Sequence, residues 1–136
     1  MDTIQIYTDG GSRGNPGPAA VGAVLLDAKG RKVEEISRPI GIATNNVAEY
    51  LAVVYALQEA VFRKASKVVI HMDSQLVARQ LKGEYRVKDQ DMRKFNDLAL
   101  NLFRGFGKVE IREIPRDENK EADALVNKAL DLSTLL

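Results

Sequence analysis

The hydrophobic period of this sequence changes near Thr44, and the change limits the folds that are open to the chain. Before that point, short alternating stretches predict three strands, at Ile4–Thr8, Ala19–Leu26 and Arg31–Pro39. Asp27–Gly30 joins the second and third strands and has the composition of a hairpin turn. The first part of the chain is therefore predicted to form an antiparallel meander.

From Thr44 onward, apolar residues recur at helical spacing and predict a long helix, with Thr44 or Asn45 as its N-cap. The recurring apolar positions are Val47, Leu51, Val54, Leu57 and Val61. Alanines occupy the opposite side, so most of the circumference of this helix is apolar. We expect the helix to pack against neighbours on more than one side.

The remainder of the chain alternates between strand and helix. Short runs rich in β-branched residues predict strands at Lys67–Met72 and Lys108–Ile114. Helical spacing predicts helices at Ser74–Leu81, Gln90–Phe103 and Asn119–Leu130. A meander followed by this alternation implies an α/β fold. Its mixed sheet would be antiparallel on one side and parallel on the other, with helices on both faces.

Composition excludes several classes of protein. The chain has no cysteine, which rules out disulfides and thiolate metal sites and suits a reducing cytoplasm, where we expect the protein to reside. No apolar run approaches the ~20 residues that span a bilayer, and the N-terminus lacks the pattern of a signal peptide, so we expect no membrane partner. At 136 residues we expect a single domain, 1–136, and a net charge of +1 confines any nucleic-acid surface to a local patch.

Two carboxylates stand at the ends of predicted strands. Asp9 precedes Gly10, and taken alone this pair indicates an Asp-Gly turn that opens a long loop, Asp9–Pro18. Asp73 precedes a helix, and taken alone it is explained as the N-cap. Ligand sites in mixed sheets nevertheless lie beyond the carboxyl ends of parallel strands, which is where both acids would be.

Two further carboxylates lie on helices. Glu49 falls beside Ala52 and Val53 rather than on a polar stripe, so a charge there should have a partner; the alternative is an ordinary, partly exposed Glu. Asp123 lies at the edge of the apolar stripe of the last helix, one turn after Asn119. The alternative interpretation of Asp123 is an ordinary, solvated residue on the helix surface.

Together the four acids support a sharper hypothesis than any one of them does alone. If they met in one pocket, their like charges would raise one another's pKa, and divalent cations would relieve the repulsion. Oxygen ligands favour Mg²⁺ or Mn²⁺, and two such ions ~3.5–4 Å apart suit in-line displacement at phosphorus. The natural substrate of such a site is a phosphodiester.

Four motifs resemble, in the same order, those of the ribonuclease HI family: Tyr7–Pro18, Thr44–Tyr50, Asp73–Gln75 and Asn119–Asp123. The resemblance spans nearly the whole chain. It implies the RNase H-like fold, with five strands in the order 3-2-1-4-5. It also implies an endonuclease that hydrolyses the RNA strand of an RNA–DNA hybrid and leaves 5′-phosphate and 3′-hydroxyl ends.

The resemblance also assigns residues. It implies that four carboxylates bind two ions, Mg²⁺ or Mn²⁺, when substrate is bound: Asp9, Glu49, Asp73 and Asp123. It implies that four polar residues contact the hybrid around its minor groove, where RNA displays its 2′-hydroxyls: Ser12, Asn15, Asn45 and Gln75. Thr44 matches a position that contacts a phosphate of the DNA strand, beside the amides of a helix N-terminus.

The chain departs from many bacterial members of the family at two places. They carry a His in the loop before the last acid, where this chain has Arg116. That residue is expected either to hold a phosphate or to be a solvated loop cation. The single His, His71, is expected to be a hydrogen-bonded strand residue. The region between Leu81 and Phe95 lacks the longer basic handle of some relatives, so the chain resembles the compact variety of archaea and some bacteria.

Other functions stay open at the level of sequence. The glycines near Asp9 do not form a nucleotide-binding motif, so we expect no nucleotide cofactor and interpret them as turn residues. The alternatives are a metal-dependent nuclease acting on other duplexes and a non-catalytic module that binds hybrids. We expect a monomer whose apolar tail, Leu130–Leu136, folds back onto the body, with a dimer contact as the alternative.

Overall fold

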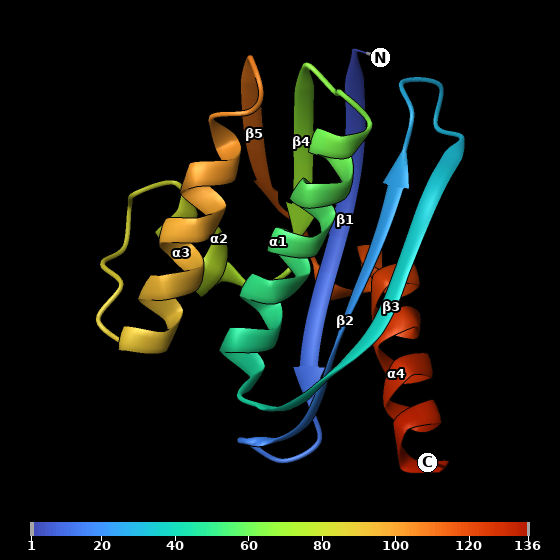
Figure 1. The fold of residues 1–136 in the computed structure, drawn as a ribbon, viewed down its shortest axis with the longest axis vertical. Helices are drawn as coiled ribbons and strands as arrows, with labels where there is room; N and C mark the ends of the chain where they lie inside the picture. Colours follow the sequence, from blue (N-terminus) through green and yellow to red (C-terminus); the bar gives the residue numbers. More distant parts are fainter. Residues whose placement is uncertain (1, 136) are drawn as a thin grey trace.

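The computed structural model describes residues 2–135 and contains a mixed sheet of five strands in the order β3-β2-β1-β4-β5 (Figure 1). The strands are β1 (Thr3–Ser12), β2 (Gly17–Leu26), β3 (Lys32–Ala43), β4 (Lys67–Met72) and β5 (Lys108–Glu113). β1, β2 and β3 pair antiparallel, whereas β1, β4 and β5 pair parallel. The predicted fold class and strand order are confirmed.

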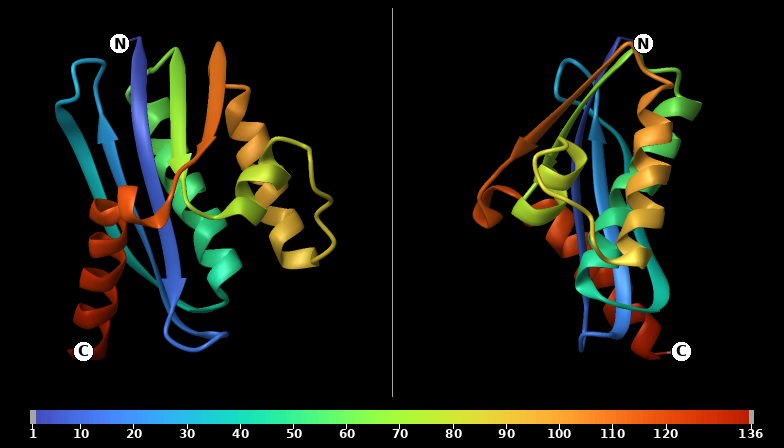
Figure 2. Two further views of the ribbon diagram at one scale, coloured as in Figure 1. Left: turned by 180° about the vertical axis from the view of Figure 1, so that it is seen from behind. Right: turned by 90° about the vertical axis from the view of Figure 1, so that its left-hand side faces the viewer.

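Helices cover both faces of the sheet, as predicted. They are α1 (Asn45–Phe62), α2 (Gln75–Leu81), α3 (Gln90–Phe103), the 3₁₀ turn η1 (Arg116–Glu118) and α4 (Lys120–Leu135). In Figure 1, α1 and α3 lie in front of the sheet, and the view from behind in Figure 2 brings α4 to the front, beside β2 and β3. β1 therefore lies between α1 on one face and α4 on the other.

The long helix α1 packs on several sides, as its composition predicts. It contacts β1, β2 and α3. Its alanines are buried along the whole helix, at Ala48, Ala52, Ala56 and Ala60. These small side chains let the helix lie close to β1. Val61, placed on the apolar stripe by its spacing, is instead 41% exposed.

The first strand is longer than its alternation predicts. β1 continues through Ser12, and its pairing with β2 includes Asp9 opposite Gly22. Asp9 therefore lies within a strand, so the interpretation of Asp9 and Gly10 as a turn is wrong. A Cβ at Gly10 would lie 2.2 Å from the carbonyl carbon of Ala48. This glycine allows α1 to approach the sheet and does not turn the chain.

Other boundaries also differ from the predicted ones, most of all the ends of β3 and of α4. β3 continues to Ala43, beyond Pro39, which an edge strand tolerates because one side of its backbone needs no partner. The apolar tail is helical, since α4 continues to Leu135. Leu130 packs with Ala20, whereas Leu132 is 53% exposed, and Leu136 lies outside the described residues. Across residues 2–135, no helix is long and apolar enough to cross a membrane.

Candidate active site

Asp9 and Asp73 lie side by side because β1 and β4 are parallel neighbours. The last residue pair of this ladder joins Thr8 to Met72; Asp9 is the next residue of β1, and Asp73 directly follows β4. Residues that continue two adjacent parallel strands emerge at the same edge of the sheet. The expectation that these two acids lie side by side is confirmed, although β1 continues past Asp9 to Ser12.

Glu49 reaches the same place from α1. The absence of a side chain at Gly10 brings the backbone of Ala48 and Glu49 against β1. Oxygen atoms of Asp9, Glu49 and Asp73 then lie within 4.8 Å of one another. We call these three residues the acidic cluster.

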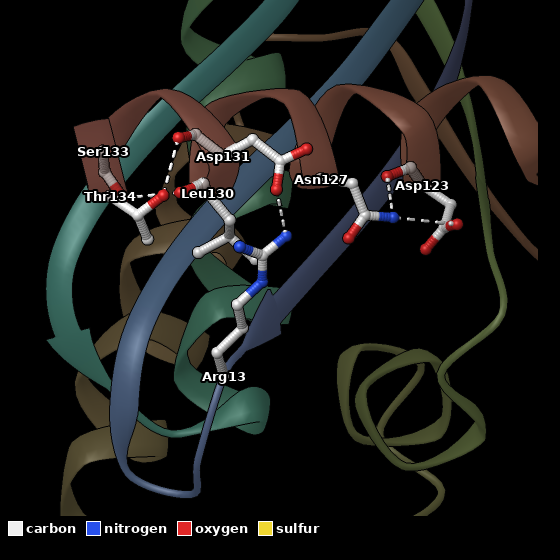
Figure 3. A network of polar contacts seen from close by, with 7 residues as sticks. All are labelled: Arg13, Asp123, Asn127, Leu130, Asp131, Ser133 and Thr134. Carbon is white, nitrogen blue, oxygen red and sulfur yellow. Dashed lines mark hydrogen bonds and ion pairs between the residues drawn. The ribbon is translucent and has the colours of Figure 1, made fainter.

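Asp123 lies at the rim of the acidic cluster. It is exposed on α4 and lines a hollow of about 310 Å³ together with the three clustered acids. α4 comes close to the sheet at Gly22, where a Cβ would lie 2.3 Å from the carbonyl oxygen of Ala122. Figure 3 shows Asn127 beside Asp123, donating from Nδ2 to the backbone oxygen at 3.2 Å and to the carboxylate at 3.4 Å.

The crowding of the acids changes their ionisation. Burial, the negative charge of Asp73 and the neighbouring Asp123 together raise the pKa of Asp9 to about 7. Burial and the charges of Asp9 and Asp73 also raise the pKa of Glu49 well above its ordinary value. The fully charged cluster is therefore unfavourable without a counter-charge. Three carboxylates with oxygen atoms this close fit a divalent cation that prefers oxygen ligands.

The N-caps of α1 and α2 are hydroxyl residues and not acids. Ser74, and not Asp73, is the N-cap of α2, and its hydroxyl accepts from the backbone nitrogen of Val77 at 3.2 Å. The interpretation of Asp73 as a cap is therefore wrong, and its carboxylate is available to the cluster. Of the two candidates for α1, Thr44 is the N-cap and accepts from Val47 at 3.2 Å.

Three of the predicted substrate contacts are bonded to one another. The side-chain oxygen of Asn45 accepts from the backbone nitrogen of Ser12 at 2.7 Å, and the backbone nitrogen of Asn45 donates to Asn15 Oδ1 at 3.0 Å. The loop between β1 and β2 is thereby attached to the start of α1. Arg13 of the same loop forms an ion pair with Asp131 of α4 at 2.5 Å, visible in Figure 3. The loop is thus attached to both helices that carry acids.

The other predicted contacts occupy different positions. Arg116, like Asn45, lines the hollow of the acids. Thr44 lines a separate hollow of about 450 Å³, together with Lys94 and Phe95. Gln75 is exposed in the first turn of α2. The structure therefore gathers the four acids around one hollow. Of the predicted substrate contacts, Asn45 and Arg116 line that hollow, and the others lie outside its lining.

His71 has the structural environment expected of a strand residue. Its ring stacks on Tyr7 with 4.2 Å between ring centroids, and its Nε2 lies 2.8 Å from Gln5 Oε1. Burial and the charge of Arg112 lower its pKa. Its ring is engaged on the sheet, and it does not line the hollow of the acids.

Sequence reasoning assigned no role to Asn119, which hydrogen-bonds to Asp73 through Nδ2 at 3.0 Å. It is only 2% exposed, which is unusual for an asparagine at the start of a helix. Its spacing of four residues before Asp123 is a signal, but a weak one. Its contacts with β1 and β4 exist only in the folded chain.

A mixed sheet that gathers carboxylates from two adjacent parallel strands defines an α/β protein whose oxygen ligands could hold a divalent metal. Residues 7–129 match the family model described as "Reverse transcriptase-like". The chain is 46% identical over 128 residues to a protein named ribonuclease HI from Halobacterium salinarum, covering 94% of this chain. The chain belongs to the ribonuclease HI family.

Solved structures agree with this assignment. The N-terminal RNase H domain of a bifunctional protein from Mycobacterium tuberculosis superposes with a TM-score of 0.92 at 42% identity, covering 95% of this chain and 99% of that domain. LC11-RNase H1, solved in complex with an RNA/DNA hybrid, gives 0.91 at 40% identity, covering 96% and 99%. The chain spans 64% of the Halobacterium protein and 35% of the full mycobacterial protein.

Proposed function

We propose that this chain is an endoribonuclease that hydrolyses the RNA strand of RNA–DNA hybrids, leaving 5′-phosphate and 3′-hydroxyl ends. The acidic cluster carries the proposal, because oxygen atoms of Asp9, Glu49 and Asp73 lie within 4.8 Å of one another, close enough to bind one ion together. A family member solved with an RNA/DNA hybrid supports the choice of substrate. Residues 1–136 would act as one catalytic domain and as a monomer, in the cytoplasm and without a nucleotide cofactor.

Four carboxylates would hold the metal: Asp9, Glu49, Asp73 and Asp123. We propose Mg²⁺ or Mn²⁺, with two ions when substrate is bound. When bound, the ions would supply an activated water and stabilise negative charge at the scissile phosphate. Asp9 is central to the set, because the charge of Asp73 and the carboxyl of Asp123 both act on it.

The residues around the acids would bind and orient the duplex. Arg116 lines the hollow of the acids, where a guanidinium can hold a phosphate. Asn45 Oδ1 is occupied by Ser12, and no acceptor in the described part of the chain takes a bond from its Nδ2. That group could donate to a 2′-hydroxyl, the group that distinguishes RNA from DNA. Asn15, Gln75 and Thr44 would contact the duplex on either side.

The test is cleavage of a duplex whose RNA strand carries a label. The protein is incubated with the RNA–DNA hybrid in Mg²⁺, in Mn²⁺ and in chelator, and with matched RNA and DNA duplexes. We expect cleavage of the RNA strand in either metal, none in chelator, and none of the DNA duplex. Cleavage of DNA or double-stranded RNA at an equal rate would instead identify a nuclease for other duplexes. Hybrid binding without cleavage in either metal would identify a non-catalytic module.

A further inference from the structure

We infer that Asn119 is a positioning residue, which fixes the Asp73 carboxylate relative to the strand that carries Asp9 through a single buried amide. The inference rests on the proposed function, since its consequence is metal binding by the acids. Asn119 lies between η1 and α4 and is 2% exposed. It is not one of the acids, and its role would be carried entirely by its hydrogen bonds.

The side-chain amide of Asn119 joins β1 to the residue that follows β4. Its Nδ2 donates to the backbone oxygen of Thr8 at 2.8 Å and to Asp73 Oδ2 at 3.0 Å. Thr8 directly precedes Asp9 in β1, and Asp73 directly follows β4. An amide nitrogen has two hydrogens, so these two bonds use its full capacity to donate. One side chain thereby links the strand of Asp9 to the carboxylate of Asp73.

The backbone of Asn119 also contacts Asp123, the acid at the rim of the cluster. Its carbonyl oxygen accepts from the backbone nitrogen of Asp123 at 3.1 Å, which is the first helical bond of α4. The position of Asp123 on the rim of the hollow is therefore set from the same residue. Glu49 reaches the cluster by another route, through the close packing of α1 at Gly10.

The side-chain amide of Asn119 does not have the orientation that is usual for an asparagine at the start of a helix. An asparagine that begins a helix ordinarily turns its oxygen toward the free backbone N–H groups of the first turn. Here Oδ1 is buried without a hydrogen-bond partner among the described residues, and the nitrogen points at the strands. A residue that gives up a local interaction in this way is expected to gain elsewhere, and the gain is the contact with Asp73.

Groups that orient metal-binding carboxylates contribute to affinity without touching the ion. Loss of such a partner typically costs about 10–100-fold in metal affinity or activity. Without the amide, the Asp73 carboxylate would lose its hydrogen bond and turn more freely. We therefore expect Asn119→Ala to weaken Mn²⁺ binding and to lower kcat, with little effect on the KM for the hybrid.

The experiment compares wild type with three variants of the full chain. Asn119→Ala removes the amide, and Asn119→Asp keeps its shape but places a carboxylate against Asp73. Asn101→Ala on α3 is the matched control, because Asn101 is exposed and far from the cluster along the chain. Each protein is titrated with Mn²⁺ by calorimetry without substrate, assayed on the hybrid, and melted in chelator.

We expect both Asn119 variants to bind Mn²⁺ about 10–100-fold more weakly than wild type and the control. kcat should fall by a similar factor, with the KM for the hybrid changed less than about threefold. If Asn119→Ala does not fold, Asn119→Asp, which has the same size, provides the comparison. Unchanged Mn²⁺ affinity with only a lower melting temperature would mean a purely structural role, and a raised KM alone would mean a substrate contact; either result overturns the inference. Failure of wild type itself to bind Mn²⁺ would overturn the proposed metal site instead.

Discussion

At the scale of one residue, Asp9 shows the electrostatic repulsion between the carboxylates of the site. It is 8% exposed, lies in a strand and faces two other acids within 4.8 Å. Its pKa is raised to about 7, above the ordinary value of a carboxyl group, by burial and by the charge of Asp73. Between about pH 4 and pH 7 the folded protein therefore binds more protons than the unfolded chain, and the stability from this residue is lost as pH rises through 7.

Asp9→Asn should separate activity from stability. The amide keeps the shape of the side chain but cannot carry charge, so we expect activity on the hybrid to fall by more than about 100-fold, beyond the cost of losing a supporting group. In chelator at pH 8 the variant should be more stable than wild type by about 1–4 kcal/mol, because folding no longer buries this charge. The gain should shrink toward pH 4, and urea unfolding at both pH values measures it.

Asp97→Asn provides the matched control for that measurement. Asp97 is an exposed acid on α3, so its neutralisation should leave both activity and stability close to wild type. An Asp9→Asn protein that retains activity would remove Asp9 from the proposed site. A variant less stable than wild type at pH 8 would contradict the repulsion between the acids.

The sequence predicts some site residues and not others, for a physical reason. Asp9 and Asp73 follow predicted strands, and adjacent parallel strands bring their ends together, so this pair could be predicted from local pattern. Asn119 could not, because both acceptors of its amide come from distant parts of the chain, Thr8 and Asp73. Long-range hydrogen bonds have no period and no fixed spacing in the sequence.

At the scale of elements, glycines decide how closely the helices approach the sheet. Strand and helix positions followed from hydrophobic period, but the turn assigned to Asp9 and Gly10 was wrong. A glycine has the same appearance in sequence whether it turns the chain or leaves room for a helix. Only the fold shows that Gly10 lies against α1 and Gly22 against α4.

Substitution of the adjacent glycines Gly10 and Gly11 should show which of them leaves room for α1. In Gly10→Ala the new Cβ would lie 2.2 Å from backbone carbon of Ala48, which cannot yield without moving α1. We expect a loss of at least about 2 kcal/mol of stability and a displaced Glu49, and hence lower activity. In Gly11→Ala the nearest atom is Val126 Cγ1 at 3.5 Å, an ordinary contact, so we expect little change.

Urea unfolding and the hybrid assay measure both glycine variants. The prediction is contradicted if Gly10→Ala is as stable and active as Gly11→Ala. A stable but inactive Gly10→Ala protein would show that α1 moves at low cost and that the position of Glu49 is what the glycine protects.

At the scale of the whole molecule, cluster and fold are coupled through charge. The chain is nearly neutral in total, yet it concentrates negative charge where the carboxyl ends of two strands meet both helical layers. A bound divalent cation would neutralise that charge and tie β1, α1 and β4 together. A ligand that binds only the folded state stabilises that state by mass action.

We therefore expect Mg²⁺ or Mn²⁺ to raise the melting temperature, and to raise it more at pH 8 than at pH 5. At about 100 times the Kd, the gain in stability is about 2.7 kcal/mol, or roughly 5–10 °C for a domain of this size. At pH 5 the protons held by Asp9 and Glu49 compete with the metal, because the pKa of each is raised in the fold.

Thermal melts in Mg²⁺ or Mn²⁺, compared with potassium chloride at equal ionic strength, test this coupling. Potassium chloride screens exposed charges but does not take oxygen ligands from a crowded cluster, so its effect should be small. Asp9→Asn should lose most of the metal-dependent rise, since it removes the acid nearest the others. Equal shifts in potassium chloride, or an undiminished shift in Asp9→Asn, would mean that the cation acts elsewhere on the surface and not through the carboxylates that join the strands.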